Sequence, residues 1–139
     1  MNGRSAATTV VAAGCDVLAI LVFVIIGRFN HHDGLRPTGI LSTFWPFALG
    51  AVLGWSLCYV VAQVRSSDLL HHDFRPESIW VDGMVIWVAT VAIGMVLRQQ
   101  FGQGIAISFV IVATIVLGLF LLGWRGARMA MLRRRLSGA

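Results

Sequence analysis

Residues 6–27 read AATTVVAAGCDVLAILVFVIIG, a stretch of 22 residues in which Asp16 is the single charged side chain. A helix of about 20 apolar residues, rising about 1.5 Å per residue, crosses a hydrocarbon core of about 30 Å. Three further stretches have the same character, at residues 44–64, 79–97 and 105–124. The sequence therefore predicts an all-α fold, a four-helix transmembrane bundle.

The composition agrees with a membrane protein. Of the 139 residues, 58% are hydrophobic and 12% are charged, whereas soluble domains carry about 25% charged residues. We expect residues 1–139 to form one integral membrane domain, with a basic tail at 125–139. The 11 basic residues are all Arg, and the absence of Lys excludes a Walker-type phosphate loop and Schiff-base chemistry. No motif points to a cofactor.

The arginines predict the orientation of the bundle. Eight Arg belong to the N-terminus, the middle loop and the C-terminus, and three belong to the other two loops. The positive-inside rule then places both termini in the cytoplasm, with four spans of a bacterial cytoplasmic (inner) membrane. Because most Arg adjoin apolar spans, the net charge of +5 indicates contact with the lipid bilayer and not with nucleic acid.

Two acidic residues fall inside spans. Asp16 lies in the second or third turn of the first span, where an acid costs about 2.5–3.5 kcal/mol on insertion scales. It is either an ion or proton site or a hydrogen-bonded packing residue, and Ser56, Thr90 and Thr114 are candidate partners. Asp82 either marks the first turn of the third span or joins Asp16 in a paired-carboxylate cation site.

The sequence His-His-Asp occurs twice, at His31, His32, Asp33 and again at residues 71–73. Histidine and aspartate are metal ligands, but adjacent histidines on a regular element point in different directions. Turn-forming polar loops are the favoured interpretation, and metal binding is the alternative.

Gly50 and Gly54 form a small-xxx-small pair that lets another helix approach closely. That helix belongs either to the same chain or to a second copy. The chain has five Trp. We expect Trp124 to be one of those that lie at the membrane interface. We expect Trp55 and Trp87 to lie deeper and to fill contacts between the helices of the bundle.

A weak internal repeat relates the two halves of the chain. Asp16 and Asp82 lie near the start of the odd-numbered spans, and Arg28 and Arg98 are the charges at the ends of those spans. The bundle is then either two weakly repeated helical hairpins or four unrelated spans with similar ends.

The basic tail continues the fourth span. We expect its arginines to hold the tail on anionic headgroups, at about 1 kcal/mol each. These residues are Arg125, Arg128, Arg133, Arg134 and Arg135.

Several short strings occur in a characteristic order. They are Gly27-Arg28 with His31-His32, Trp45-Pro46-Phe47 with Gly54-Trp55, Trp87 with Thr90, Gly94-Met95 and Arg98, and residues 108–113 followed by Gly123-Trp124-Arg125. From about Asp16 to Arg125 the chain resembles the small membrane protein family known as domain of unknown function (DUF) 3054. The resemblance implies a membrane architecture and no established activity.

The favoured function is a non-enzymatic accessory or assembly subunit of a larger membrane complex. Small size and the lack of a nucleophile–base pair or a metal motif support it. The partner is then another membrane protein, or a second copy of this chain. The alternative is a small ion- or proton-coupled transporter or channel-like bundle that uses Asp16.

Overall fold

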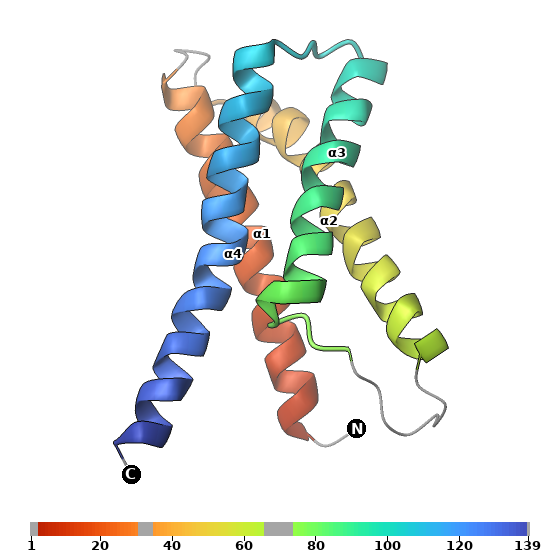
Figure 1. Ribbon diagram of the computed structural model, residues 1–139. Helices are drawn as coiled ribbons and strands as arrows, with labels where there is room; N and C mark the ends of the chain where they lie inside the picture. Colours follow the sequence, from red (N-terminus) through yellow and green to blue (C-terminus); the bar gives the residue numbers. More distant parts are fainter. Residues whose placement is uncertain (1–2, 31–34, 66–73, 139) are drawn as a thin grey trace.

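The computed structural model describes residues 3–30, 35–65 and 74–138, and the backbone only at residues 3–5 and 30. These residues form α1 (Gly3–Asn30), α2 (Pro37–Arg65), the π-helical turn η1 (Ile79–Gly83), α3 (Met84–Gln100) and α4 (Ile107–Ser137) (Figure 1). Four helices, with η1 and α3 together as one, are long and apolar enough to cross a membrane. The predicted all-α transmembrane bundle is confirmed, and the chain is a multi-pass membrane protein.

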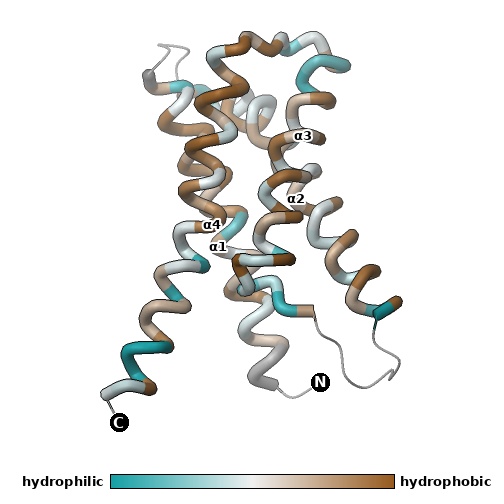
Figure 2. Tube along the Cα trace, in the orientation of Figure 1, coloured by the Kyte–Doolittle hydropathy of each residue, from teal (hydrophilic) through white to brown (hydrophobic). Residues whose placement is uncertain are grey.

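The two ends of the bundle differ in what they hold. Helix α1 begins and α4 ends at the same end, which we call the termini end (Figure 1). The turn from α3 to α4 lies at the opposite end, the hairpin end, where α1 also ends. Apolar residues dominate the middle of the bundle, and the strongly polar residues of α4 lie near its C-terminus (Figure 2).

Helix α2 begins earlier than the predicted span at 44–64, because helical hydrogen bonds continue through the polar flank. Pro37 is its first residue, a position where the missing N–H costs nothing. Pro46 therefore lies inside the helix, whereas a span that began at residue 44 would have placed it in the first turn. A proline there cannot bond the carbonyl four residues earlier. That carbonyl belongs to Ser42, and it accepts a hydrogen bond from Gln103 Nε2 at 3.0 Å.

Helices α2 and α3 form the closest pair in the bundle. A Cβ atom at Gly50 would lie 2.9 Å from the carbonyl oxygens of Ala89 and Thr90. One at Gly54 would lie 3.0 Å from Ile86 Cα. The two glycines of the small-xxx-small pair thus bring α2 against α3 of the same chain.

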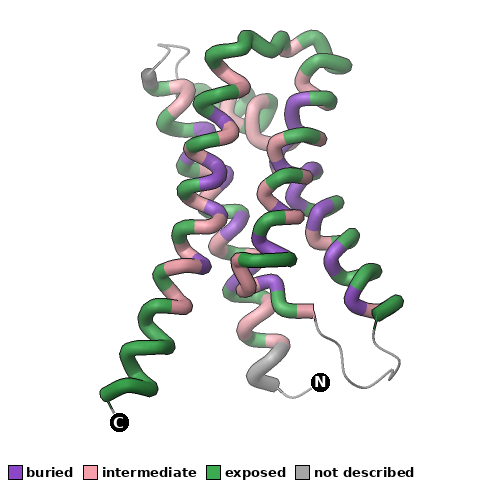
Figure 3. The backbone as a smooth tube through the Cα atoms, in the orientation of Figure 1, coloured by how far each residue is buried: buried purple, intermediate pink, exposed green. Residues whose placement is uncertain are grey.

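The apolar core occupies the middle of the bundle and draws on all four helices. Its buried members are Ile20, Phe23, Val24, Phe47, Ala51, Met95, Ala113, Leu117 and Leu121. Phe23 and Phe47 meet edge to face with ring centroids 5.4 Å apart, a favourable geometry for aromatic pairs. The outward faces of the helices are exposed over most of their length (Figure 3), and they carry many large apolar side chains. Those faces are the surface that lipid covers in a membrane protein.

We predict that Gly50→Ala destabilises the bundle by about 1–3 kcal/mol, because the added methyl group meets backbone atoms that cannot turn away. Thermal unfolding in mild detergent measures this change. Gly14→Ala is the matched control, since a Cβ atom there meets nothing within 4 Å and alanine favours a helix. Equal melting temperatures for the two variants would contradict the close α2–α3 contact.

Candidate functional site

Asp16 of α1 forms an ion pair with Arg125 of α4 inside the bundle. Arg125 Nη1 donates to Asp16 Oδ1 at 2.7 Å, and Nη2 donates to Oδ2 at 2.8 Å. The two residues are 2% and 0% exposed. This two-bond geometry between a guanidinium and a carboxylate is the strongest form of a protein ion pair.

Two tryptophans complete the hydrogen bonding of the carboxylate. Trp55 Nε1 of α2 donates to Oδ2 at 2.9 Å, and Trp124 Nε1 donates to Oδ1 at 2.9 Å. Asp16 therefore accepts four hydrogen bonds, which matches the acceptor capacity of an ionised carboxylate. A proton or a cation would have to displace one of these donors to bind Asp16.

Two further donors of Arg125 bind carbonyl oxygens. Its Nε donates to the Pro76 carbonyl at 2.8 Å, and its Nη1 also donates to the Leu121 carbonyl of its own helix. The guanidinium carbon lies 4.5 Å from the centre of the Trp124 ring, within the range of a cation–π contact. We call the Asp16, Arg125, Trp55 and Trp124 side chains with the Pro76 carbonyl the ionic lock.

Pairing is what makes these charges tolerable in a membrane. A lone charged side chain in a span is costly, and such residues pair with one another or with carbonyls. Removing one partner of a buried pair leaves an uncompensated charge and costs about 3–5 kcal/mol. The lock thus joins α1, α2, α4 and the segment before η1 through one neutral cluster.

The sequence-based prediction that Arg125 contacts anionic lipid is wrong. The side chain is fully buried because the Asp16 carboxylate lies at the same depth, and pairing with it is stronger than contact with a headgroup. The partners suggested for Asp16 also differ from those observed. Ser56, Thr90 and Thr114 each donate to a carbonyl of their own helix, as is common for hydroxyls in helices.

Asp82 lies beside the lock, in η1. It is 8% exposed, and its Oδ2 accepts a hydrogen bond from the backbone N–H of Arg75 at 2.8 Å. The Cys58 thiol of α2 lies 3.7 Å from the Asp82 carbonyl oxygen. A Cβ atom at Gly83 would lie 2.9 Å from Arg125 Cδ. Asp82 thus ties the segment before η1 to the ends of α2 and α3, while Asp16 pairs with Arg125.

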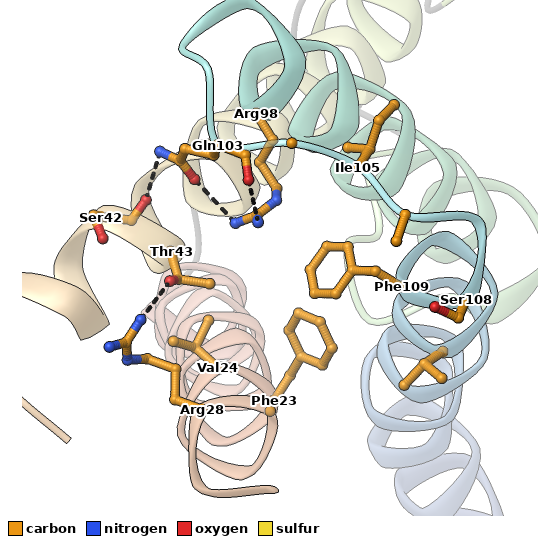
Figure 4. A pocket seen from close by; sticks show the side chains of 14 residues that line it. Phe23, Val24, Arg28, Ser42, Thr43, Arg98, Gln103, Ile105, Ser108 and Phe109 are labelled. Atoms are coloured by element: carbon orange, nitrogen blue, oxygen red, sulfur yellow. Dashed lines mark hydrogen bonds between the residues drawn. The ribbon is translucent and has the colours of Figure 1, made fainter. Parts of the chain in front are cut away.

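Arg28 and Arg98 both lie at the hairpin end, where they line a cavity of about 960 Å³. Arg98 Nη1 donates to Gln103 Oε1 at 2.9 Å, and Arg28 Nη1 lies 3.4 Å from Thr43 Oγ1 (Figure 4). We call this cavity the arginine pocket. Its other lining residues are Phe23, Val24, Gly27, Ser42, Gly104, Ile105, Ala106, Ser108, Phe109 and Val112.

Of the other predicted residues, the first His-His-Asp is not described, and the arginines of the tail after Arg125 lie outside these two sites. His31, His32 and Asp33 fall outside the described residues, and no group of three metal-ligating side chains occurs within 3–30, 35–65 and 74–138. Arg128 is partly exposed, 3.9 Å from the Glu77 carboxylate. Arg133, Arg134 and Arg135 are exposed near the end of α4 (Figure 3), and their lipid contact stays a prediction.

Sequence reasoning identified Asp16 but missed its partners. The sequence predicts a packing role for Trp55 and an interface position for Trp124, but an indole N–H in a span also needs an acceptor. That requirement was the available signal. Nothing in the sequence marks the Pro76 carbonyl or Gln103 as contributors.

Four membrane-spanning helices and a buried ion pair define a multi-pass membrane protein with a charged cluster in its interior. Residues 13–128 match the model of the family described as Protein of unknown function (DUF3054). The chain belongs to this family. No curated protein and no solved structure matches the chain.

We predict that Asp16→Asn and Arg125→Gln each destabilise the protein by about 3–5 kcal/mol, because each leaves one buried charge unpaired. The double variant removes both charges and loses less than the sum of the single losses. Unfolding in detergent, followed by circular dichroism, measures all three. Arg128→Gln is the control and loses less than about 1 kcal/mol, as partly exposed pairs do. Additive losses would contradict a coupled pair.

Proposed function

We propose that the protein is a small, non-enzymatic carrier that exposes a binding cavity alternately at its two ends. The observation that carries this proposal is the order of features along the bundle. The arginine pocket lies at the hairpin end, the apolar core in the middle and the ionic lock toward the termini end. A carrier needs a site accessible from one side while the other side is closed.

Two helix pairs are suited to move against each other. Helices α2 and α3 pack tightly through Gly50 and Gly54, and the Cys58–Asp82 contact extends that pair to η1. Helices α1 and α4 are joined by the Asp16–Arg125 ion pair. The arginine pocket has walls from both pairs, so a rotation of one pair against the other would close it.

The lock is built so that this motion leaves the ion pair intact. Two hydrogen bonds of the lock cross from one pair of helices to the other, Trp55 to Asp16 and Arg125 to the Pro76 carbonyl. Hydrogen bonds to charged groups contribute about 1.5–3 kcal/mol each. A state that breaks both therefore lies a few kcal/mol higher, the range of minor states that a ligand can populate.

The expected orientation gives the carrier a direction. With both termini in the cytoplasm of a bacterium, the arginine pocket opens toward the outside of the cytoplasmic membrane and the lock closes the cytoplasmic side. In this proposal Asp16 closes the cytoplasmic end together with Arg125. It is no binding site for the transported solute, which modifies the ion-coupled alternative that the sequence raised.

We predict that Trp55→Phe opens the termini end about tenfold more often. The variant removes the hydrogen bond from Trp55 to Asp16 and keeps an aromatic ring at this position. The reporter is Cys58, which is 4% exposed, in a Cys15→Ala background. A membrane-impermeant maleimide added from the cytoplasmic side should label Cys58 about tenfold faster in this variant. The lost hydrogen bond lowers the free energy of opening by about 1.4 kcal/mol, which is a factor of ten in the population of the open state.

Trp45→Phe is the matched control, because Trp45 lies at the hairpin end, where its ring meets Phe101. Its Cys58 labelling rate should equal that of the parent. Unchanged labelling in Trp55→Phe would count against a lock that opens. Labelling of Cys58 from the opposite side alone would refute the orientation.

A second candidate is the accessory or assembly subunit, and the end of α4 favours it. Residues 130–138 are exposed on every side (Figure 3). They include Met131 and Leu132, at 64% and 49% exposed, beside the three consecutive arginines. Such a helical arm is suited to a partner with an apolar and acidic surface. For this function we expect a larger complex after extraction in mild detergent, lost when the chain ends at Met129. A carrier would yield the same monomer or homo-oligomer with or without the arm.

A further inference from the structure

Arg98 of α3 brings a positive charge into the arginine pocket and has no acidic partner among residues 3–30, 35–65 and 74–138. Its Nη1 and Nη2 face the Oε1 and carbonyl oxygens of Gln103, at 2.9 and 3.5 Å. Its guanidinium carbon lies 4.5 Å from the centre of the Phe109 ring. Its Nε is buried and has no hydrogen-bond partner in the part of the chain that the structure describes. A partly buried charge and a buried N–H without an acceptor both favour an added anion.

The same cavity receives positive potential from two other sources. Arg28 of α1 lines it, with its guanidinium lying against Gly39 and reaching toward Thr43. The N-terminus of α4 also faces it through Ser108 and Phe109, and the helix has no side-chain cap at Ala106. The N-terminus of a long helix attracts anions through its free N–H groups. None of the described lining residues is acidic.

Part of the wall of the arginine pocket is apolar. Phe23, Val24, Phe109 and Val112 form this part, and Figure 4 shows the rings of Phe23 and Phe109 side by side. A volume of about 960 Å³ is at the upper end of the range for organic ligands, about 300–1,000 Å³. An inorganic anion would leave most of this space and the whole apolar wall unfilled.

We propose that the arginine pocket binds an amphipathic anion, a ligand with one carboxylate or phosphate group and an apolar chain. The acidic group lies between Arg98, Arg28 and the first turn of α4, and the chain lies against the phenylalanines. Such a ligand is either an acidic membrane lipid or a water-soluble organic anion, which share this chemistry. The inference rests on the proposed function, for which it names the substrate class.

The test measures binding of radiolabelled dodecanoate to the protein in phosphatidylcholine nanodiscs, after subtraction of binding to empty discs. We expect saturable binding that dodecyl phosphate displaces and that dodecanol and inorganic phosphate leave unchanged. Equal displacement by dodecanol would overturn the need for an anion. Equal displacement by inorganic phosphate would overturn the need for an apolar chain.

Two variants locate the binding, and one serves as the matched control. Arg98→Gln and Arg28→Gln should each weaken dodecanoate binding at least about tenfold, because each removes a charge-assisted hydrogen bond. Arg36→Gln changes an exposed arginine near the same end, outside the pocket, and should bind as the parent does. Ser108→Trp fills the cavity with both arginines in place and should also abolish binding, so the result does not depend on the folding of Arg98→Gln. Parent-like binding in the folded Ser108→Trp protein would overturn the site.

Two further measurements complete the test. The first distinguishes a lipid ligand from a soluble anion, and the second distinguishes failure of the pocket ligand from failure of the carrier. Native mass spectrometry after reconstitution in phosphatidylglycerol should retain one lipid per chain, lost in Ser108→Trp, if the ligand is a lipid. If dodecanoate binds and no phosphatidylglycerol is retained, the ligand is a soluble anion. Dodecanoate binding that leaves the labelling rate of Cys58 unchanged supports the pocket and refutes the carrier. Absence of dodecanoate binding, with faster labelling in Trp55→Phe, refutes the pocket ligand and leaves the carrier standing.

Discussion

The Asp16–Arg125 ion pair is the constraint on which the other contacts near the termini end depend. A carboxylate and a guanidinium in a membrane are each too costly to remain alone, so α1 and α4 must meet with these residues at the same depth. That requirement fixes the register of the two helices. It also places Trp55 and the Pro76 carbonyl. The Asp16 carboxylate needs a further donor, which Trp55 supplies, and the Nε of Arg125 needs an acceptor, which is the Pro76 carbonyl.

The two ends of the bundle treat charge in opposite ways. At the lock, each charge has a partner of opposite sign, and Asp16 and Arg125 each form four hydrogen bonds. At the arginine pocket, Arg98 has only neutral partners among the described residues. In the proposed carrier this difference has a physical reason, since the closed end must be neutral to exclude water and the binding site must keep part of its interaction energy for the ligand.

The spans could be predicted from the sequence, because membrane insertion depends on composition over about 20 residues. The helix ends could not, since backbone hydrogen bonding continues into polar flanks such as residues 37–43. The partner of Asp16 was missed for a different reason. Arg125 adjoins the predicted end of its span, where an arginine usually reaches a headgroup. Asp16 and Arg125 lie at the same depth in the bundle, but this follows only from the positions of both helix ends. The depth of Asp16 is counted from Gly3 at the start of α1, and that of Arg125 from Ser137 at the end of α4.

The weak repeat between the two halves stays a prediction, but the structure gives its matching positions unequal surroundings. Asp16 pairs with an arginine, while Asp82 accepts a backbone N–H from the segment that carries the Pro76 carbonyl. Asp82 therefore holds the segment whose carbonyl Arg125 uses, whereas Asp16 binds Arg125 directly. Arg28 and Arg98, by contrast, face one cavity from separate helices. If the halves derive from one hairpin, the acids have diverged into a direct and an indirect partner of Arg125, and the arginines have kept a shared site.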